Sequence, residues 1–189
     1  MNTAEKLSIT PEEYLEGETV AEYRHEYVDG EIFAMAGSSD AHASISINIA
    51  AHLKGQLRGS GCRVYISDMK AKVSETRYFY PDILLTCDKR DSQHNYSKLH
   101  PILLIEVLSS STEAYDRGKK FEYYRQLDSL EEYALISQDD YHVDIFRKNQ
   151  QQRWELFSFS GVDIQVCFAS IDCCMDMAVL YEDVNFELS

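Results

Sequence analysis

The sequence has no hydrophobic run long enough to cross a membrane, and it has few prolines and few basic residues. A transmembrane helix needs about 20 consecutive apolar residues, and no stretch of the 189 residues approaches that length. The amino-terminal residues MNTAEKLSITPEEY contain no apolar core after a basic segment, so they do not read as a secretion signal. We therefore expect a soluble, cytoplasmic protein with no membrane partner.

Basic residues are outnumbered by acidic ones, 18 against 32, which gives a net charge of −14. Proteins that bind nucleic acid non-specifically usually carry a basic surface. The composition therefore argues against such a protein, although a small basic or metal-filled cleft on an acidic body is compatible with it. Only three prolines interrupt the chain, and no repeat or low-complexity linker divides it. The length suits one folded domain over residues 1–189.

Cysteine spacing gives no metal-binding or redox motif. The chain has five cysteines, an odd number, and none of them forms a CxxC pair. In a chain without a secretion signal, cysteines are usually reduced. We expect five thiols that act as small packing residues. They are Cys62, Cys87, Cys167, Cys173 and Cys174.

The amino-terminal third predicts a helix, a hairpin and a longer helix. Thr10 followed by Pro11 is typical of a helix start. Two strand-like runs flank Asp29 and Gly30, a pair favoured in tight hairpin turns. Apolar residues then recur every four positions over residues 40–58, which indicates one buried helical face.

The central third predicts buried strands around a helix. YPDILLT and PILLIEVL are apolar enough to be strands covered on both faces. A helix is predicted from Thr112 to about Leu127, and the unit from Pro101 to Ser137 should form a right-handed parallel crossover. The mixed order of helices and strands indicates an α/β or α+β fold, with helices packed against a sheet.

Two carboxylates lie where buried strands are expected to be apolar. Asp82 directly precedes the run ILL, and Glu106 ends the run PILLI. Burying an ionised carboxylate is costly unless a partner or a metal compensates its charge. If the two strands are neighbours, both side chains project from one region of the sheet, where hard oxygen ligands suit Mg²⁺ or Mn²⁺. A turn bond or a strand-end ion pair is the structural alternative for each.

A lysine in the helix after Glu106 supplies the next element. Lys120 shares a helical face with Tyr124 and Leu127, so we expect it at the edge of the buried stripe. An ammonium beside a metal-bound water can orient that water or stabilise charge on a phosphate. An ordinary ion pair with Asp116, four residues earlier, is the alternative.

Two further features have structural interpretations. His42 lies in the first turn of the long helix, on the face of Ile45 and Ile49, and we interpret it as a packing residue. The hydroxyl run at residues 109–112 is interpreted as a loop and a helix cap, although hydroxyls and free amides at a helix start also suit phosphate.

Three segments together resemble a known family. They are YVDGEIFAMAGSSDAHASISINI, YPDILL, and LLIEVLSSSTEAYDRGKKFEYYRQLDSLEEYALI. They resemble the Uma-two family of putative restriction endonucleases, within the PD-(D/E)xK nuclease superfamily, over most of the chain from about Thr10 to Arg147. The resemblance implies a restriction-endonuclease-like core, which is a mixed sheet flanked by helices.

The resemblance also implies a divalent-metal site. Asp82 supplies its first acid and Glu106 its second, with the Val107 carbonyl as a further ligand. The usual superfamily lysine stands two residues after the second acid, where this chain has Leu108. Members of this family place the lysine on the following helix, which matches Lys120.

One more acid comes from the hairpin, where Glu31 matches the family's glutamate and is expected to complete the site. The resemblance thus implies a magnesium- or manganese-dependent endonuclease that hydrolyses DNA. Its catalytic residues would be Asp82, Glu106, Lys120 and Glu31. A two-fold homodimer would let one active site address each strand of a duplex.

Two other functions are compatible with the acidic composition. One is a catalytically silent nuclease fold that serves as a binding or interaction module. The other is a metal-dependent hydrolase of small phosphate esters. If the substrate is DNA, the candidates for phosphate contact are Arg63, Lys70, Lys72, Arg77, Arg117 and Lys119.

Overall fold

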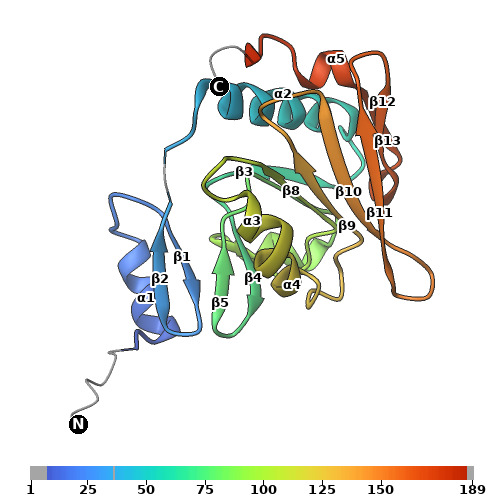
Figure 1. Ribbon diagram of the computed structural model, residues 1–189. Helices are drawn as coiled ribbons and strands as arrows, with labels where there is room; N and C mark the ends of the chain where they lie inside the picture. The colour runs from blue at the N-terminus through green and yellow to red at the C-terminus, as the bar shows by residue number, and fades with distance from the viewer. Residues whose placement is uncertain (1–7, 36, 187–189) are drawn as a thin grey trace.

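The fold is built on a six-stranded mixed sheet. A computed structural model describes residues 8–35 and 37–186, and Figure 1 shows their arrangement. The strands of this sheet, in spatial order, are β11 (Trp154–Ser160), β10 (His142–Lys148), β9 (Glu132–Ile136), β8 (Leu103–Val107), β6 (Ile83–Thr86) and β3 (Arg63–Ile66). Strands β8 and β9 are parallel, and the other neighbours are antiparallel. The predicted parallel pairing and the predicted mixed sheet are both confirmed.

Helices cover both faces of this sheet. Every residue of β6, β8 and β9 is therefore buried, as in strands that pack on both sides. Helix α2 (Asp40–Gln56) lies on one face, where Ile45, Ile49 and Leu53 are fully buried. A helical segment after β8 lies on the other face, where Phe121 and Tyr124 pack against alternate strand residues.

The carboxy-terminal elements extend the α2 side of the core. They are β12 (Gln165–Phe168), the 3-10 helix η3 (Ala169–Ile171), β13 (Cys173–Asp176) and α5 (Met177–Leu180). Strands β12 and β13 pair with each other, and their buried side chains join the cluster that contains the inner face of α2. Figure 1 shows this segment beside the carboxy-terminal half of α2.

A second sheet carries the amino-terminal hairpin. In spatial order its strands are β2 (Glu31–Ala34), β1 (His25–Val28), β5 (Arg77–Phe79), β4 (Lys70–Ser74) and β7 (Ser97–Lys98). Asp29 and Gly30 both have positive φ, 50° and 96°, as a tight primed turn requires. Helix α1 (Pro11–Glu18) begins with a capping box between Thr10 and Glu13 and packs on this sheet through a cluster of three tyrosines.

The segment after β8 differs from the continuous helix that the sequence predicted from Thr112 to about Leu127. It consists of α3 (Glu113–Tyr115), the π-helix η2 (Asp116–Lys120) and α4 (Phe121–Tyr124). A π-turn inserts one extra residue and turns the following side chains relative to an α-helix. The hydroxyl of Tyr133 on β9 donates to the carbonyl of Asp116 at 3.1 Å and supports this turn from the sheet.

The 3-10 helix η1 (Lys89–Gln93) lies between β6 and β7 and completes the set of elements. None of the helices in residues 8–35 and 37–186 has the length and apolar character that a membrane span requires.

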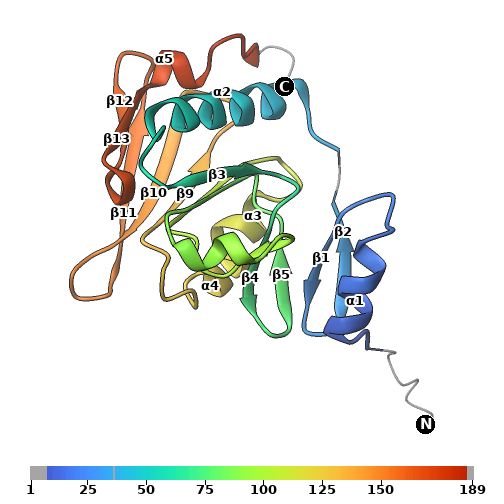
Figure 2. The same ribbon diagram turned by 180° about the vertical axis from the view of Figure 1, so that it is seen from behind.

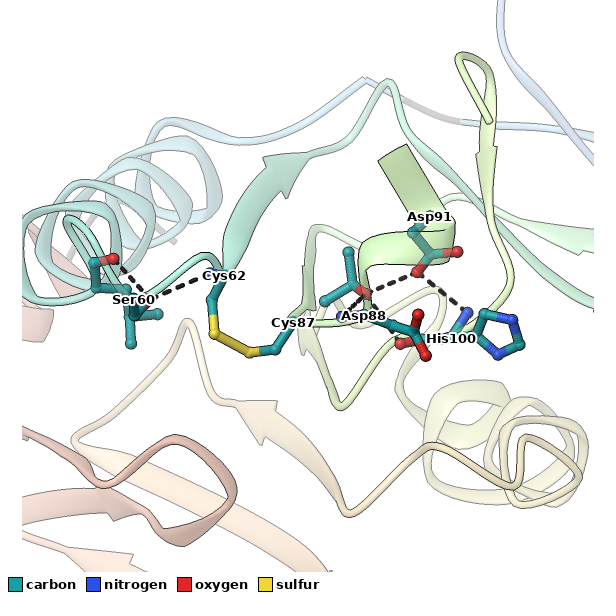
Figure 3. Close-up of a disulfide and its surroundings, with 8 residues drawn as sticks. Ser60, Cys62, Cys87, Asp88, Asp91 and His100 are labelled. Carbon is teal, nitrogen blue, oxygen red and sulfur yellow. Dashed lines mark hydrogen bonds between the residues drawn. A yellow bond between two sulfur atoms is a disulfide. The ribbon is translucent and has the colours of Figure 1, made fainter. Parts of the chain in front are cut away.

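The cysteines differ from the expected five thiols. Cys62 is bonded to Cys87 and Cys167 to Cys174, while Cys173 is a buried thiol. Cys167 and Cys174 stand opposite each other on β12 and β13, and the other pair lies one step beyond the last residue pair of β3 and β6 (Figure 3). Cross-strand partners can be far apart along the chain, so motif spacing could not reveal them.

A thiol titration should therefore find one reactive cysteine in denatured, unreduced protein and five after reduction. Ellman's reagent in guanidinium chloride measures the number directly. As a control, Cys173→Ala should titrate to zero without reductant. Five thiols in unreduced protein would contradict both disulfides.

Candidate functional site

Asp82 and Glu106 face each other across two central strands. Ile83 pairs with Ile105 in the antiparallel ladder of β6 and β8, so the next step of the same register sets Asp82 opposite Glu106. Opposite residues in such a ladder have Cβ atoms about 4.5–5.5 Å apart. Both residues are buried, with exposed fractions of 8% and 4%. The sheet thus brings together the two acids that the sequence singled out.

Two hydrogen bonds fix the carboxylate of Asp82. Its Oδ2 accepts the backbone N–H of Val107 at 2.8 Å, and its Oδ1 lies 2.9 Å from His42 Nε2. His42 stands in the first turn of α2, where Ser39 caps the helix by accepting the His42 N–H. The start of α2 and the end of β8 therefore orient the same carboxylate.

Lys120 is buried at the centre of a group of three carboxylates, of which Glu106 and Asp116 are buried and Glu26 is partly buried. Its Nζ is 2.9 Å from Glu106 Oε1, 3.0 Å from Glu26 Oε1 and 3.5 Å from Asp116 Oδ1. The hydroxyl of Tyr124 donates to the same Glu106 oxygen at 2.9 Å. These side chains come from β1, β8, η2 and α4, so the cluster joins the hairpin to the central sheet.

The acids outnumber the cations in this cluster. Asp82, Glu106, Glu26 and Asp116 supply four carboxyl groups, and Lys120 supplies one ammonium. Burial raises the pKa of Glu106 well above its ordinary value, and Lys120 offsets this only in part. Burial also raises the pKa of Asp116. Such a cluster favours an added proton or an added cation.

The charge state of Lys120 is set by its partners. Burial by itself would lower the pKa of Lys120, but the carboxylates of Glu106 and Glu26 outweigh burial and raise that pKa well above its ordinary value. Lys120 is therefore an ammonium at neutral pH. It can donate hydrogen bonds and stabilise negative charge, but it is a poor proton acceptor.

The donor chemistry of Asp82 and Glu106 suits a hard divalent cation. Mg²⁺ is commonly held by one or two carboxylates, with water and substrate phosphate completing its shell. Within residues 8–35 and 37–186, no three His, Cys, Asp or Glu side chains are arranged as a ready metal cage. The two facing acids thus fit a cation that keeps most of its shell as water. The Val107 carbonyl as a third ligand remains a prediction.

The hairpin contributes an acid that the sequence did not single out. Glu31 is exposed on β2, and it is not among the three carboxylates that the described residues place within 3.5 Å of Lys120 Nζ. The hairpin acid within that distance of Lys120 is Glu26 on β1. Its Oε1 also accepts the N–H of Tyr80 at 3.3 Å. Directly paired residues share a face of a hairpin. Since Glu26 pairs with Phe33 and Val28 with Glu31, both acids lie on one face.

Two further residues of the cluster had other sequence interpretations. His42, interpreted as a packing residue, contacts Asp82. Asp116, considered only as an ordinary ion-pair partner for Lys120, is buried at 3% exposure. A charged residue on the helical face of Lys120 and Tyr124 was the available signal for Asp116. The contact of His42 depends on how α2 docks on the sheet, which the sequence pattern does not show.

Comparison with known proteins places these residues in a family. The model of the Uma2 family, described as "Putative restriction endonuclease", matches residues 11–171. Two uncharacterised proteins of Synechocystis sp. are 36% and 31% identical to the chain. The first match covers 94% of both chains, and the second covers 85% of this chain and 93% of the relative.

A solved structure shows the same fold. The crystal structure of a putative nuclease belonging to DUF820 from Anabaena variabilis superposes with a TM-score of 0.74 at 18% identity. The superposition covers 92% of this chain and 97% of that one. At this identity the likeness establishes the fold, and it confirms the restriction-endonuclease-like core that the sequence predicted. The family match over residues 11–171 adds the lineage: the chain belongs to the Uma2 family of putative restriction endonucleases.

Proposed function

We propose that the chain is a metal-dependent endonuclease that hydrolyses phosphodiester bonds of DNA. The observation that carries this proposal is the excess of buried acid around Lys120 at the place where Asp82 and Glu106 face each other. Keeping four carboxyl groups out of water around one ammonium is costly for a site that only holds the fold together. A bound cation would offset this free-energy cost by compensating the excess negative charge, and a phosphate could then bind beside the cation.

Asp82 and Glu106, with the Val107 carbonyl, would hold Mg²⁺ or Mn²⁺. When bound, such an ion polarises a phosphoryl oxygen and lowers the pKa of a bound water. The bonds from Val107 and His42 keep Asp82 oriented for this purpose. Because those bonds use one lone pair on each oxygen, each oxygen still has a second one to offer.

Lys120 would stabilise the negative charge that develops on the attacked phosphate. Its position between Glu106 and Glu26 keeps it protonated and close to the metal-binding acids. Preorganised cations in a buried site act strongly on developing charge, because no solvent has to reorganise. Glu26 and Asp116 would act through Lys120 by holding its ammonium in place.

Duplex DNA as substrate suits a two-fold homodimer, in which each protomer would cut one strand. A DNA substrate would also imply that the protein acts in the cytoplasm, where the DNA is. A silent nuclease fold would need the same ion pairs only for stability, so metal binding separates the two functions. A small-ester hydrolase would cleave bis-p-nitrophenyl phosphate at least as well as plasmid DNA.

Replacing Lys120 by methionine should lower plasmid cleavage by roughly 100- to 1,000-fold, as for other preorganised charge-stabilising groups. Lys119→Met is the matched control, because Lys119 is exposed and its ion-pair partner is Glu122, outside the cluster. Supercoiled plasmid with 5 mM Mg²⁺ or Mn²⁺ gives the rate. Calorimetric titration of the metals into wild type and Glu106→Gln should show binding that is lost with Glu106. A wild type that binds neither metal and cuts no DNA would favour the silent module.

The two hairpin acids should behave differently. Glu26→Gln should lower the cleavage rate by about 10- to 100-fold, as second-layer substitutions commonly do, while Glu31→Gln tests the acid that the family resemblance implied. Because Glu26 raises the pKa of Lys120, its loss should also move the alkaline limb of the pH–rate profile to lower pH. A larger loss with Glu31→Gln than with Glu26→Gln would reverse the assignment.

Glu106→Gln should make the protein more stable at pH 8, by about 1 kcal/mol, a common gain when a strained functional group is removed. The pKa of Glu106 is raised by folding, so its stabilising contribution is complete below its unfolded value of 4.5. That contribution is lost as pH rises through the folded pKa. Thermal unfolding followed by circular dichroism between pH 5 and 8 should thus show a steeper fall in Tm for wild type.

Mg²⁺ supplies the second readout of the same experiment. At 100 times its Kd, Mg²⁺ should add about 2.7 kcal/mol to the unfolding free energy of wild type at pH 8 and so raise its Tm. The Tm of Glu106→Gln should not change. Equal pH slopes and equal responses to Mg²⁺ in both proteins would contradict the charge imbalance described for this cluster.

A further inference from the structure

Most of the cations that the sequence offered for phosphate contact are engaged within the molecule. Four have carboxylate partners at 2.6–3.0 Å, namely Lys72 with Glu75, Arg77 with Asp29, Arg117 with Asp144, and Lys119 with Glu122. Lys70 is buried and donates to the hydroxyl of Tyr80. Arg63 is different, because it is exposed and forms no ion pair with any residue in the described ranges.

Arg63 lines a pocket of about 420 Å³ together with two more cations, Lys54 and Arg58. All three side chains are exposed, and no aspartate or glutamate lines the pocket. Neither Lys54 nor Arg58 forms an ion pair with the residues that the structure describes. On a chain of net charge −14, this pocket is a local concentration of positive charge that attracts anions.

A short, braced turn between α2 and β3 holds two of these cations. The Oγ of Ser60 accepts the N–H of Cys62 at 3.1 Å, and the disulfide from Cys62 to Cys87 ties the turn to the residue after β6 (Figure 3). Arg58 and Arg63 flank this braced segment. A fixed backbone lowers the entropy that ligand binding would cost, so the pocket is largely prepared for a ligand.

The pocket lies at the opposite end of the β3–β6 ladder from Asp82, and at the opposite end of α2 from His42, so these elements set its spacing from the acids. Along α2, Lys54 is twelve residues beyond His42, which is about 18 Å at the helical rise. Along the ladder, Arg63 pairs with Thr86, four residues beyond Asp82, which is about 13 Å. Figure 2 shows α2 and β3 running side by side.

This spacing matches a nucleic-acid strand. Successive phosphates advance about 3.4 Å along the axis for each nucleotide of one strand, so 13–18 Å corresponds to about four or five nucleotides. We propose that Lys54, Arg58 and Arg63 form a second phosphate site, which holds the backbone of the strand whose scissile phosphate lies at Asp82 and Glu106. The inference rests on the proposed nuclease function. Contacts of this kind position a substrate and do not read its sequence.

The test measures binding of a labelled 20-base-pair duplex to the full chain carrying Glu106→Gln, with EDTA present so that no cleavage is needed. Into this background goes the double substitution Arg58→Ala/Arg63→Ala. The matched control is Arg90→Ala/Arg153→Ala, which removes the same charge from two exposed arginines outside the pocket. Fluorescence anisotropy at several salt concentrations gives both Kd and its salt dependence.

The pocket variant should bind roughly 10- to 100-fold more weakly at 0.1 M salt, and the slope of log K against log salt should become shallower by about 1.8, as expected for two lost phosphate contacts. The control should keep the Kd and the slope of its parent. A pocket variant that behaves like the control overturns the inference. So does a variant that loses binding of inorganic phosphate while its duplex binding is unchanged, because the pocket would then hold free phosphate.

Cleavage by the wild-type chain separates this inference from the proposed function. Pocket-dependent duplex binding in a protein that never cuts DNA would reject the nuclease and keep the pocket. In a protein that does cut, the double substitution should raise KM and leave kcat unchanged. Normal cleavage with unchanged KM and unchanged duplex binding would reject the pocket and keep the nuclease.

Discussion

The ammonium of Lys120 among three carboxylates, two buried and one partly buried, is the interaction on which the rest of the site depends. It joins the amino-terminal hairpin, through Glu26, to the central sheet, through Glu106, and to its own helical segment, through Asp116. Without it, four carboxyl groups would share a buried region with no fixed positive charge, which a marginally stable fold cannot easily tolerate. With Lys120 in place, the site still has more carboxyl groups than cations, and this excess of acid favours the binding of an added cation.

The sheet and its two layers of helices bring the charged side chains of this cluster together. Register alone sets Asp82 opposite Glu106, and the same register sends the neighbouring strand residues into apolar layers on both faces. Helix α2 contributes at its two ends, with His42 against Asp82 at the start and Lys54 near the cationic pocket at the end. The π-turn of η2 sets the direction of Lys120 after the strand has delivered Glu106.

The sequence was informative where a residue broke a simple pattern. Asp82 and Glu106 stood out because they interrupt apolar strands. Lys120 stood out because it shares a helical face with Tyr124 and Leu127, and the family resemblance implied a lysine on the same helix. The mixed sheet and the parallel strand pair followed from element order and were confirmed. Glu26 and His42 gave no such signal, because their place depends on how the hairpin and α2 dock on the sheet. The disulfides were missed for a related reason, since opposite positions on paired strands leave no fixed spacing. The π-turn was missed because no pattern in its residues, DRGKK, distinguishes a π-turn from an α-helix.

The dispersed origin of the charged cluster has a consequence for how the protein is made. Glu26 and Lys120 are 94 positions apart (120 − 26), so at a synthesis rate of about 5–20 residues per second the hairpin leaves the ribosome roughly 5–20 seconds before its lysine. For most of that interval Glu26 exists on a chain that has neither Lys120 nor the strand β8 that carries Glu106. The cluster can therefore assemble only after Lys120 has left the ribosome, and a nascent chain that ends before Lys120 cannot contain it.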